Sequence, residues 1–102
     1  MKEYLTVVAK FKAKAGKEAE LRETLLSLVK PTHAEEGCVN YDLHQSTQDP
    51  RVFIFHENWT SEGLLDRHLG SDHLMKAAAR AASLLEGPME IHRLKKISAA
   101  KV

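Results

Sequence analysis

Cysteine, long apolar runs and an excess of charge of either sign are all scarce in this sequence. The single cysteine, Cys38, excludes an intrachain disulfide and leaves no cysteine spacing for a zinc site. No apolar run approaches the roughly 20 residues that span a bilayer, and the first residues are too charged for a signal peptide. We therefore expect a cytoplasmic protein without a membrane segment.

The charges nearly cancel, with 15 basic residues against 14 acidic ones. The nearest approach to a basic patch is Lys10, Lys12, Lys14 and Lys17, a pattern typical of a solvated sheet edge. The chain has no P-loop, no glycine fingerprint for a dinucleotide and no serine nucleophile elbow. We expect no nucleic-acid partner and no cofactor.

The 102 residues are sufficient for one domain, 1–102, with a loose tail at about 98–102. A helix is predicted over 17–30, and its continuation beyond Pro31 is left open. A second helical region is capped at 60–61, interrupted at Gly70 and restarted at Ser71. Apolar runs and turn signals predict strands at 5–11, 38–46, 51–59 and 89–97. The order β-α-β-β-α-β is that of a ferredoxin-like α+β fold with an antiparallel sheet.

The strand predicted at 51–59 is apolar on both faces, since "VFIF" at 52–55 shows no alternation. Helices cover only one face of such a sheet, so we expect the other face to meet a second copy in a homodimer. Pairing Ser46 with Arg51 predicts which side chains share a face. One face then carries Val39, Tyr41, Leu43, Val52, Ile54 and His56, and the other carries Cys38, Asn40, Asp42, His44, Phe53, Phe55, Glu57 and Trp59.

His68 is the most interesting candidate for chemistry. It follows Leu64 and Leu65 at helical spacing, so it points near their apolar face. One interpretation is a packed histidine with a structural hydrogen bond. The other is a neutral imidazole lining a cavity, ready to accept a proton near pH 7.

A metal site is not expected from the histidine spacing. On one helix His68 and His73 would lie about 140° apart, whereas a zinc helix uses positions i and i+4. A site would need a meeting with His44, His56 or His92, which no spacing predicts. His73 falls in the first turn of a helix, where a solvent-facing role and a ligand hydrogen bond are both open.

The aromatic residues and their polar neighbours allow two interpretations. Trp59, Tyr41, Phe53 and Phe55 are typical of a core, and they are also candidate walls for a substrate. The polar residues Asn40, Asp42, His44 and Glu57 are predicted to share their face with aromatics. If that face is buried, they must pair with each other or with a ligand; if it faces solvent, they carry no information.

A set of these residues, taken in order, resembles the antibiotic biosynthesis monooxygenase (ABM) domain family. The residues that carry the resemblance are Glu36-Gly37-Cys38, Tyr41, Leu43, Asp49-Pro50, Phe53, Glu57, Trp59, His68, Ser71 and His73. The resemblance covers essentially the whole chain and implies a dimeric α+β barrel, in which two protomers pack sheet to sheet. It also implies a small cavity for aromatic molecules in each protomer.

Members similar to this chain include cofactor-free quinol monooxygenases, which oxidise a dihydroxy-aromatic with dioxygen. The resemblance therefore implies a catalytic base, with His68 first and His44 or His73 next. The candidate substrate-binding residues are Trp59, Tyr41, Phe53, Phe55 and Asn40.

Other branches of the family supply alternatives. Haem-degrading relatives use an asparagine, a tryptophan and a histidine at positions that here hold Ala9, His68 and Ala78, so none of the three matches. A second branch isomerises a phosphorylated signalling sugar, and Lys10, Arg67 or Arg80 are the candidates for its phosphate grip. A non-catalytic dimer that binds a small ligand is the third alternative.

Overall fold

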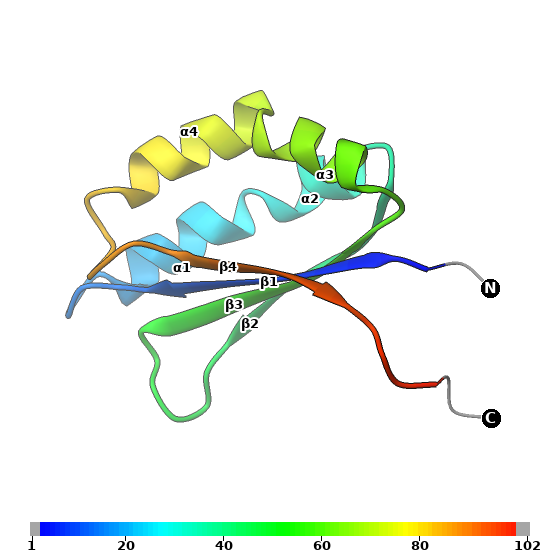
Figure 1. Cartoon of the computed structure of the whole chain (residues 1–102). Coiled ribbons are helices and arrows are strands. Elements are labelled where there is room, and N and C mark those ends of the chain that lie inside the picture. The colour runs from blue at the N-terminus through cyan, green and yellow to red at the C-terminus, as the bar shows by residue number, and fades with distance from the viewer. Residues whose placement is uncertain (1–2, 100–102) are drawn as a thin grey trace.

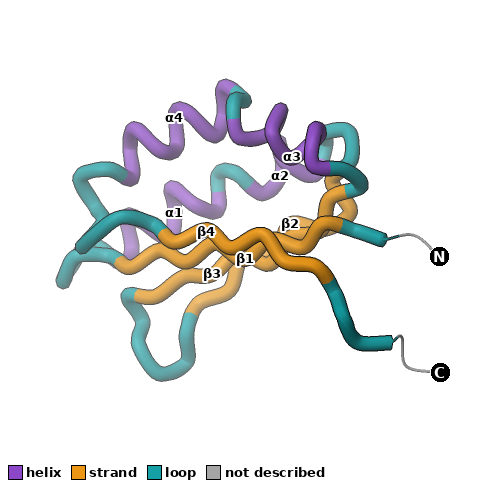
Figure 2. Tube along the Cα trace, in the orientation of Figure 1, coloured by secondary structure: helices purple, strands orange, loops and turns teal. Residues whose placement is uncertain are grey.

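The structure is a computed structural model that describes residues 3–99. A four-stranded sheet is covered on one side by four short helices (Figures 1 and 2). The elements in chain order are β1 (Leu5–Lys12), α1 (Glu18–Leu26), α2 (Val29–His33), β2 (Cys38–Gln45), β3 (Val52–Trp59), α3 (Glu62–Leu69), α4 (Asp72–Ala81) and β4 (Glu90–Lys95). The predicted tail lies partly outside the described residues.

The strands are ordered β2-β3-β1-β4, and every neighbouring pair is antiparallel. Each predicted helical region is present but divided into two helices. The structure therefore confirms the predicted ferredoxin-like α+β fold. In the described part of the chain, no helix is both long enough and apolar enough to span a bilayer.

The break in the first helical region falls earlier than Pro31. Thr24 and Ser27 donate side-chain hydrogen bonds to backbone carbonyls of their own helix, at Glu20 and Thr24. Such back-bonding competes with the helical ladder and bends helices, so the chain breaks between Leu26 and Val29. Pro31 then lies in the first turn of α2, where a proline's missing N–H is tolerated.

The second helical region is divided as the sequence predicts. Ser61 Oγ accepts a hydrogen bond from Leu64 N at the start of α3. Ser71 Oγ does the same for Leu74 N at the start of α4, and Gly70 lies between the two helices. The two caps allow the chain to change direction within a few residues, so side chains of α3 and α4 approach each other over the sheet.

The register of the β2–β3 hairpin differs by one residue from the prediction. Ser46 N donates to Val52 O, and Gln45 pairs with Phe53, so every β2 residue from Asn40 onward is displaced to the other face. An irregularity at Val39 then returns Cys38 to its place opposite Trp59. The predicted faces were therefore wrong for β2, because a slip of one residue reverses a strand.

The helix-facing side of the sheet forms the core. Tyr41, Phe53, Phe55 and Trp59 are all at most 2% exposed and pack under Leu21, Leu25 and Leu65. The Tyr41 and Phe55 rings stack with their centroids 4.4 Å apart. The burial of these large side chains is the main stabilising contribution of the sheet, at roughly 25 cal/mol per Å² of apolar surface.

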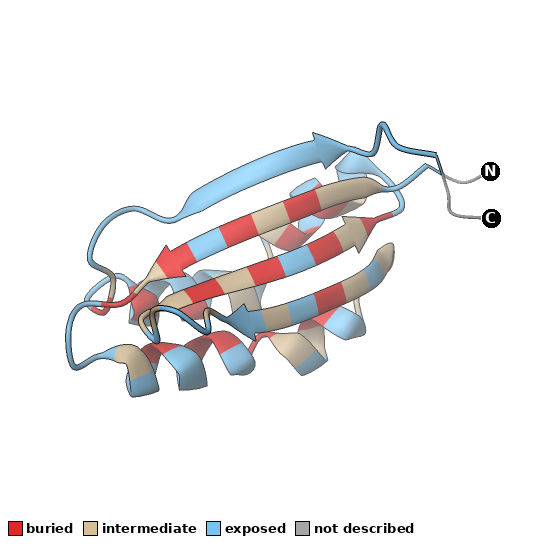
Figure 3. Cartoon of the chain, turned by 90° about the horizontal axis from the view of Figure 1, so that it is seen from below, coloured by how far each residue is buried: buried red, intermediate tan, exposed pale blue. Residues whose placement is uncertain are grey.

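Within residues 3–99, no layer covers the opposite side of the sheet (Figure 3). Cross-strand pairs place Val8 beside His56, His44 beside Ile54, and Asn40 beside Asn58 on this open face. Val8 and Ile54 are half-buried, while His44 and His56 are exposed. The open face is therefore part apolar and part polar.

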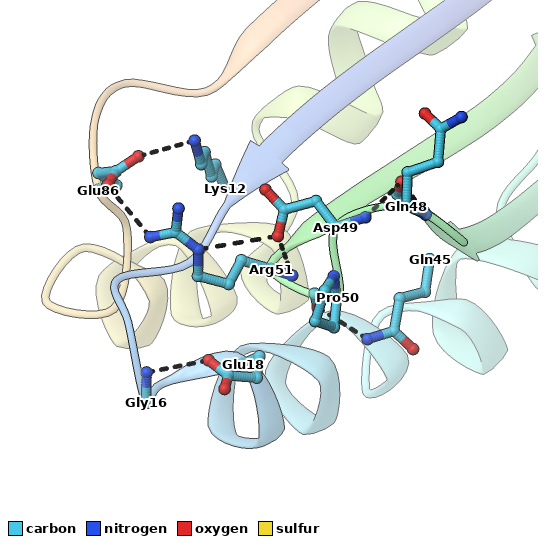
Figure 4. Close-up of polar contacts among 10 residues, drawn as sticks. Lys12, Gly16, Glu18, Gln45, Gln48, Asp49, Pro50, Arg51 and Glu86 are labelled. Atoms are coloured by element: carbon cyan, nitrogen blue, oxygen red, sulfur yellow. Dashed lines mark hydrogen bonds and ion pairs between the residues drawn. The ribbon is translucent and has the colours of Figure 1, made fainter.

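At the end of the sheet away from α3, polar contacts hold three connections together (Figure 4). Glu86 pairs with Arg51 and with Lys12 at 3.2 Å each, and Arg51 also lies 3.7 Å from Asp49. These pairs are exposed, so each contributes at most about 1 kcal/mol. They fix the β2–β3 turn against β1 and the segment after α4, and they lie far from the site described next.

Gly37 controls the approach of the α2–β2 connection to α3. Its φ is +86°, and a Cβ built on it would lie 2.5 Å from Leu64 Cδ1. Gly37 O also accepts a hydrogen bond from Thr60 N at 2.9 Å. Only glycine permits both this conformation and this close approach, which brings Glu35 beside α3.

Candidate active site

A small cavity lies between the sheet and helices α3 and α4. Its volume is about 40 Å³, room for about three water molecules. Its wall is almost wholly apolar, and the exposed Met89 and Ile91 mark its opening. The lining residues that matter most are Val7, Ala9, Tyr41, Phe55, Glu57, Leu65, His68, Leu69 and Leu74. A larger ligand must extend through the mouth.

His68 projects from α3 into this cavity and is 2% exposed. Its ring packs against Tyr41 and Trp59, with centroids 5.4 Å and 4.8 Å away. Nδ1 lies 2.6 Å from Glu35 Oε2, so Nδ1 carries the proton that the carboxylate accepts. Nε2 makes no hydrogen bond within residues 3–99, which leaves its lone pair for the cavity.

The electrostatics of His68 favour the neutral ring. Burial lowers the pKa of His68 below its usual value, and the nearby His73 acts in the same direction. The Glu35 carboxylate opposes this effect without overcoming it. His68 is thus an oriented, neutral imidazole at pH 7, the form that accepts a proton.

Glu35 joins two histidines from two helices. Its Oε2 is 2.9 Å from His73 Nε2 as well as 2.6 Å from His68 Nδ1, and the two rings are 6.0 Å apart. Ser71 Oγ lies 3.3 Å from the same His73 nitrogen. The separation of about 140° expected for one continuous helix does not apply, because the predicted break at Gly70 leaves His68 on α3 and His73 on α4, and the two side chains converge on Glu35.

The donor atoms of Glu35, His68 and His73 all lie within 4.8 Å of one another, which makes them the one group of metal-ligand type in residues 3–99. Two ligands on a tetrahedral zinc are separated by roughly 3.3 Å, given metal–ligand bonds of about 2.0–2.1 Å. The observed separations of 2.6 Å and 2.9 Å are shorter and match direct hydrogen bonds. The present geometry is that of a hydrogen-bonded cluster, which would have to expand to hold a metal.

Glu57 is the second ionisable group of the cavity. It lies on β3 between Val7 and Tyr41 of the neighbouring strands, and it is 4% exposed. Trp59 Nε1 donates to Glu57 Oε1 at 2.9 Å. Burial raises the pKa of Glu57 to about 7, the Trp59 hydrogen bond opposes this rise, and the Glu35 charge adds to it. Glu57 therefore exchanges a proton near neutral pH.

The structure places the predicted substrate-binding residues in three environments. Tyr41 and Phe55 line the cavity. Trp59 packs on His68 behind the wall, and Phe53 lies in the core outside it. Asn40 lies on the open face, where it bonds to Asp42, His56 and Asn58.

His44, the second predicted base, is exposed on the open face and does not approach His68. His56 and His92 share that open face, so none of the three joins the Glu35 cluster. Lys10 also lies there, and Arg67 is exposed and 3.8 Å from Glu36. None of Lys10, Arg67 and Arg80 lines the cavity.

Sequence reasoning missed Glu35 and undervalued Glu57. Glu35 lies in a connection between helix and strand, so no periodicity indicated its direction. Glu57 alternates with Phe55 and Trp59 along a strand, and that spacing does place it among buried aromatics. Cys38 is a free thiol whose pKa burial raises to about 11, so it is not activated as a nucleophile.

Comparison with known proteins agrees with this architecture. Residues 4–80 match the model of the family described as "Antibiotic biosynthesis monooxygenase". "Putative monooxygenase Rv0793" of Mycobacterium tuberculosis is 33% identical over 87 residues, 85% of each chain. "Putative monooxygenase YcnE" of Bacillus subtilis is 29% identical over 89 residues, 87% of this chain and 94% of its own.

Solved structures show the same fold over nearly the whole chain. PA3566 from Pseudomonas aeruginosa superposes with a TM-score of 0.89 at 33% identity, covering 96% of this chain and 98% of that one. The structure of Rv0793 gives a TM-score of 0.88 at 31% identity, covering 96% and 99%. The sequence resemblance is confirmed: this chain belongs to the antibiotic biosynthesis monooxygenase family.

Proposed function

We propose that this chain is a cofactor-independent monooxygenase that oxidises a quinol or a related small aromatic with dioxygen. The observation that carries the proposal is His68, a buried imidazole held by Glu35 at 2.6 Å, whose other nitrogen has no partner among residues 3–99 and borders an apolar cavity. Family membership and the names of the relatives support the reaction class. The apolar wall, with Tyr41 and Phe55, matches an aromatic ring in chemical character, and at about 40 Å³ the cavity requires the ring to extend through its mouth.

In this mechanism His68 Nε2 removes a hydroxyl proton from the bound aromatic. Glu35 accepts the Nδ1 hydrogen bond, fixes the tautomer and stabilises the imidazolium that forms. The resulting anion is electron-rich and reacts with dioxygen in a cavity whose wall is almost wholly apolar. For a benzenediol, each molecule of diol consumes one molecule of dioxygen and gives one molecule of hydroxyquinone and one of water.

The alternatives receive less support from the site. Isomerisation of a phosphorylated sugar needs a cation in the cavity, and Lys10, Arg67 and Arg80 lie outside its lining. A ligand-binding protein without activity would not need an oriented base. It predicts aromatic binding without turnover, which oxygen uptake distinguishes.

We also propose that the working unit is a homodimer formed through the open face of the sheet. The half-buried Val8, Val52 and Ile54 on that face support a partner of the same kind, since one layer of helices leaves it uncovered. The cavity lies on the other side of the sheet, so the dimer leaves its mouth beside Met89 and Ile91 free.

The test is oxygen uptake by metal-stripped protein with a panel of quinols. We expect uptake above autoxidation, and a fall of about 10²–10⁴-fold for His68→Ala, the usual range for loss of a general base. Glu35→Gln should reduce the rate less. His44→Ala, which removes an exposed histidine on the open face, should retain the wild-type rate. Uptake that survives His68→Ala but not His44→Ala would contradict the assignment of the base.

A further inference from the structure

Glu57 has a hydrogen-bonding capacity that the protein does not use. Trp59 Nε1 binds its Oε1, and its Oε2 has no partner within residues 3–99. In that part of the chain Thr32 Oγ1 is the one fully enclosed side-chain polar atom without a partner. Because Glu57 Oε2 also has no partner but is not such an enclosed atom, it must touch open space. The space that Glu57 lines is the cavity.

His68 Nε2 also has a hydrogen-bonding capacity that the described part of the protein does not use. It also lacks a partner within residues 3–99, and its residue lines the same cavity from the helix side while Glu57 lines it from the sheet side. Two unpartnered polar atoms in an otherwise apolar cavity are unfavourable unless a ligand satisfies them. A structural role for Glu57 explains only the bond to Trp59, which a neutral glutamine would also provide.

Building on the proposed function, we propose that Glu57 is a second substrate-contacting residue and that the ligand is an aromatic ring bearing two oxygen substituents. One ring oxygen meets His68 Nε2, and the other meets the free oxygen of Glu57. The rest of the ring contacts Tyr41, Phe55 and Leu65. The two polar contacts, with His68 and with Glu57, select diols and their quinone products over monohydroxylated rings.

The two contacts also account for the protons of the reaction. His68 accepts the proton of one hydroxyl, and Glu57 accepts the proton of the other as that oxygen becomes a carbonyl. One atom of dioxygen forms the new C–O bond on a ring carbon, and the C–H bond of that carbon breaks as its hydrogen moves to this oxygen and becomes the new hydroxyl hydrogen. The O–O bond breaks, the second atom takes up the two protons and leaves as water, and the diol loses four electrons to dioxygen. Because burial raises the pKa of Glu57 to about 7, this carboxyl can hold and release a proton near neutral pH.

The test is calorimetric binding under nitrogen of benzene-1,4-diol and of phenol, which lacks only the second hydroxyl. We expect wild type to bind the diol at least about tenfold more tightly, the usual effect of one hydrogen bond to a charged group. Glu57→Leu should reduce that preference to within about twofold and leave phenol affinity unchanged. Glu23→Gln, a change of an exposed carboxyl on α1, is the matched control.

Folding of Glu57→Leu is checked by its thermal melt, and Glu57→Met is the second variant if the first melts early. Both replace a carboxyl by an apolar group of similar size, so the fold should tolerate them. A diol preference that persists in a folded Glu57 variant would overturn the inference while leaving the monooxygenase proposal intact. A Glu57-dependent preference without oxygen uptake would uphold the inference and refute the monooxygenase. Failure of wild type to bind either ring would refute the inference, and the monooxygenase would then be decided by oxygen uptake with the panel of quinols.

Discussion

Replacing Glu57 by glutamine should stabilise the protein above neutral pH. Glutamine has almost the same shape and keeps an oxygen for the Trp59 Nε1 hydrogen bond, but it never ionises. The pKa of Glu57 is raised from 4.5 to about 7 in the folded protein, mainly by burial. A shift of this size corresponds to about 3 kcal/mol, an upper limit because the carboxyl borders a cavity that admits water.

The direction of this pH dependence follows from the number of protons that the folded and unfolded states bind. Between pH 4.5 and about 7 the folded protein holds a proton on Glu57 that the unfolded chain has released, so wild-type stability falls as pH rises through this window. Glu57→Gln does not undergo that loss. His68 has the opposite effect, because its lowered pKa removes stability as pH falls below its usual range, but this contribution is common to both proteins and cancels in their difference.

Urea unfolding at pH 4.5, 6, 7 and 8 measures this difference, with fluorescence of Trp59, the single tryptophan, as the signal. Protein concentration is held constant, because the stability of the proposed homodimer would depend on it. The variant and wild type should be nearly equal at pH 4.5, and the variant should be more stable by about 1–3 kcal/mol at pH 8. Glu23→Gln should differ from wild type by less than about 0.5 kcal/mol at every pH. A constant difference for Glu57→Gln across the whole range would refute the reasoning.

Three further predictions concern the backbone, the dimer and metals. Gly37→Ala should lower the free energy of unfolding by about 3 kcal/mol, because it combines a φ of +86° with a Cβ 2.5 Å from Leu64 Cδ1. Gly16→Ala has a φ of +83° but no atom within 4 Å of its Cβ, so it should lower the free energy of unfolding by only about 1 kcal/mol. Equal losses in urea unfolding would contradict the packing argument. Ile54→Asp, on the open face, should weaken the proposed dimerisation at least about 100-fold in analytical ultracentrifugation. Leu26→Asp, at an exposed helix position, should leave dimerisation unchanged. A dimer that is equally stable in Ile54→Asp would show that the open face is not the interface. Chelation of metals should leave oxygen uptake unchanged, since the Glu35 cluster has hydrogen-bond spacing; activity lost to the chelator and restored by one metal would contradict this.

The sequence predicted the elements of the fold well because each leaves a local signal. Ser61 and Ser71 lie at real helix starts, and the interruption at Gly70 is where one helical region divides. The register of the hairpin failed for a non-local reason. The turn after Gln45 and the irregularity at Val39 each shift pairing by one residue, and neither has a distinctive sequence signature.

The candidate site was only partly predictable for the same kind of reason. His68 was found because helical spacing places it on the apolar face of α3. Glu35 approaches it from 33 positions away, through a connection whose path depends on Gly37 and Leu64. Asn40 and His44 were placed beside the aromatics by the same register slip, and the structure puts them on the open face.

The most direct test of the central claim is the fate of labelled dioxygen. Wild-type protein is supplied with a quinol and ¹⁸O₂, and the organic product is analysed by mass spectrometry. The monooxygenase account predicts a hydroxyquinone that contains one ¹⁸O atom, with the second atom in water, and a loss of this labelled product in His68→Ala. An unlabelled quinone formed together with hydrogen peroxide would show simple oxidation, and it would contradict the account.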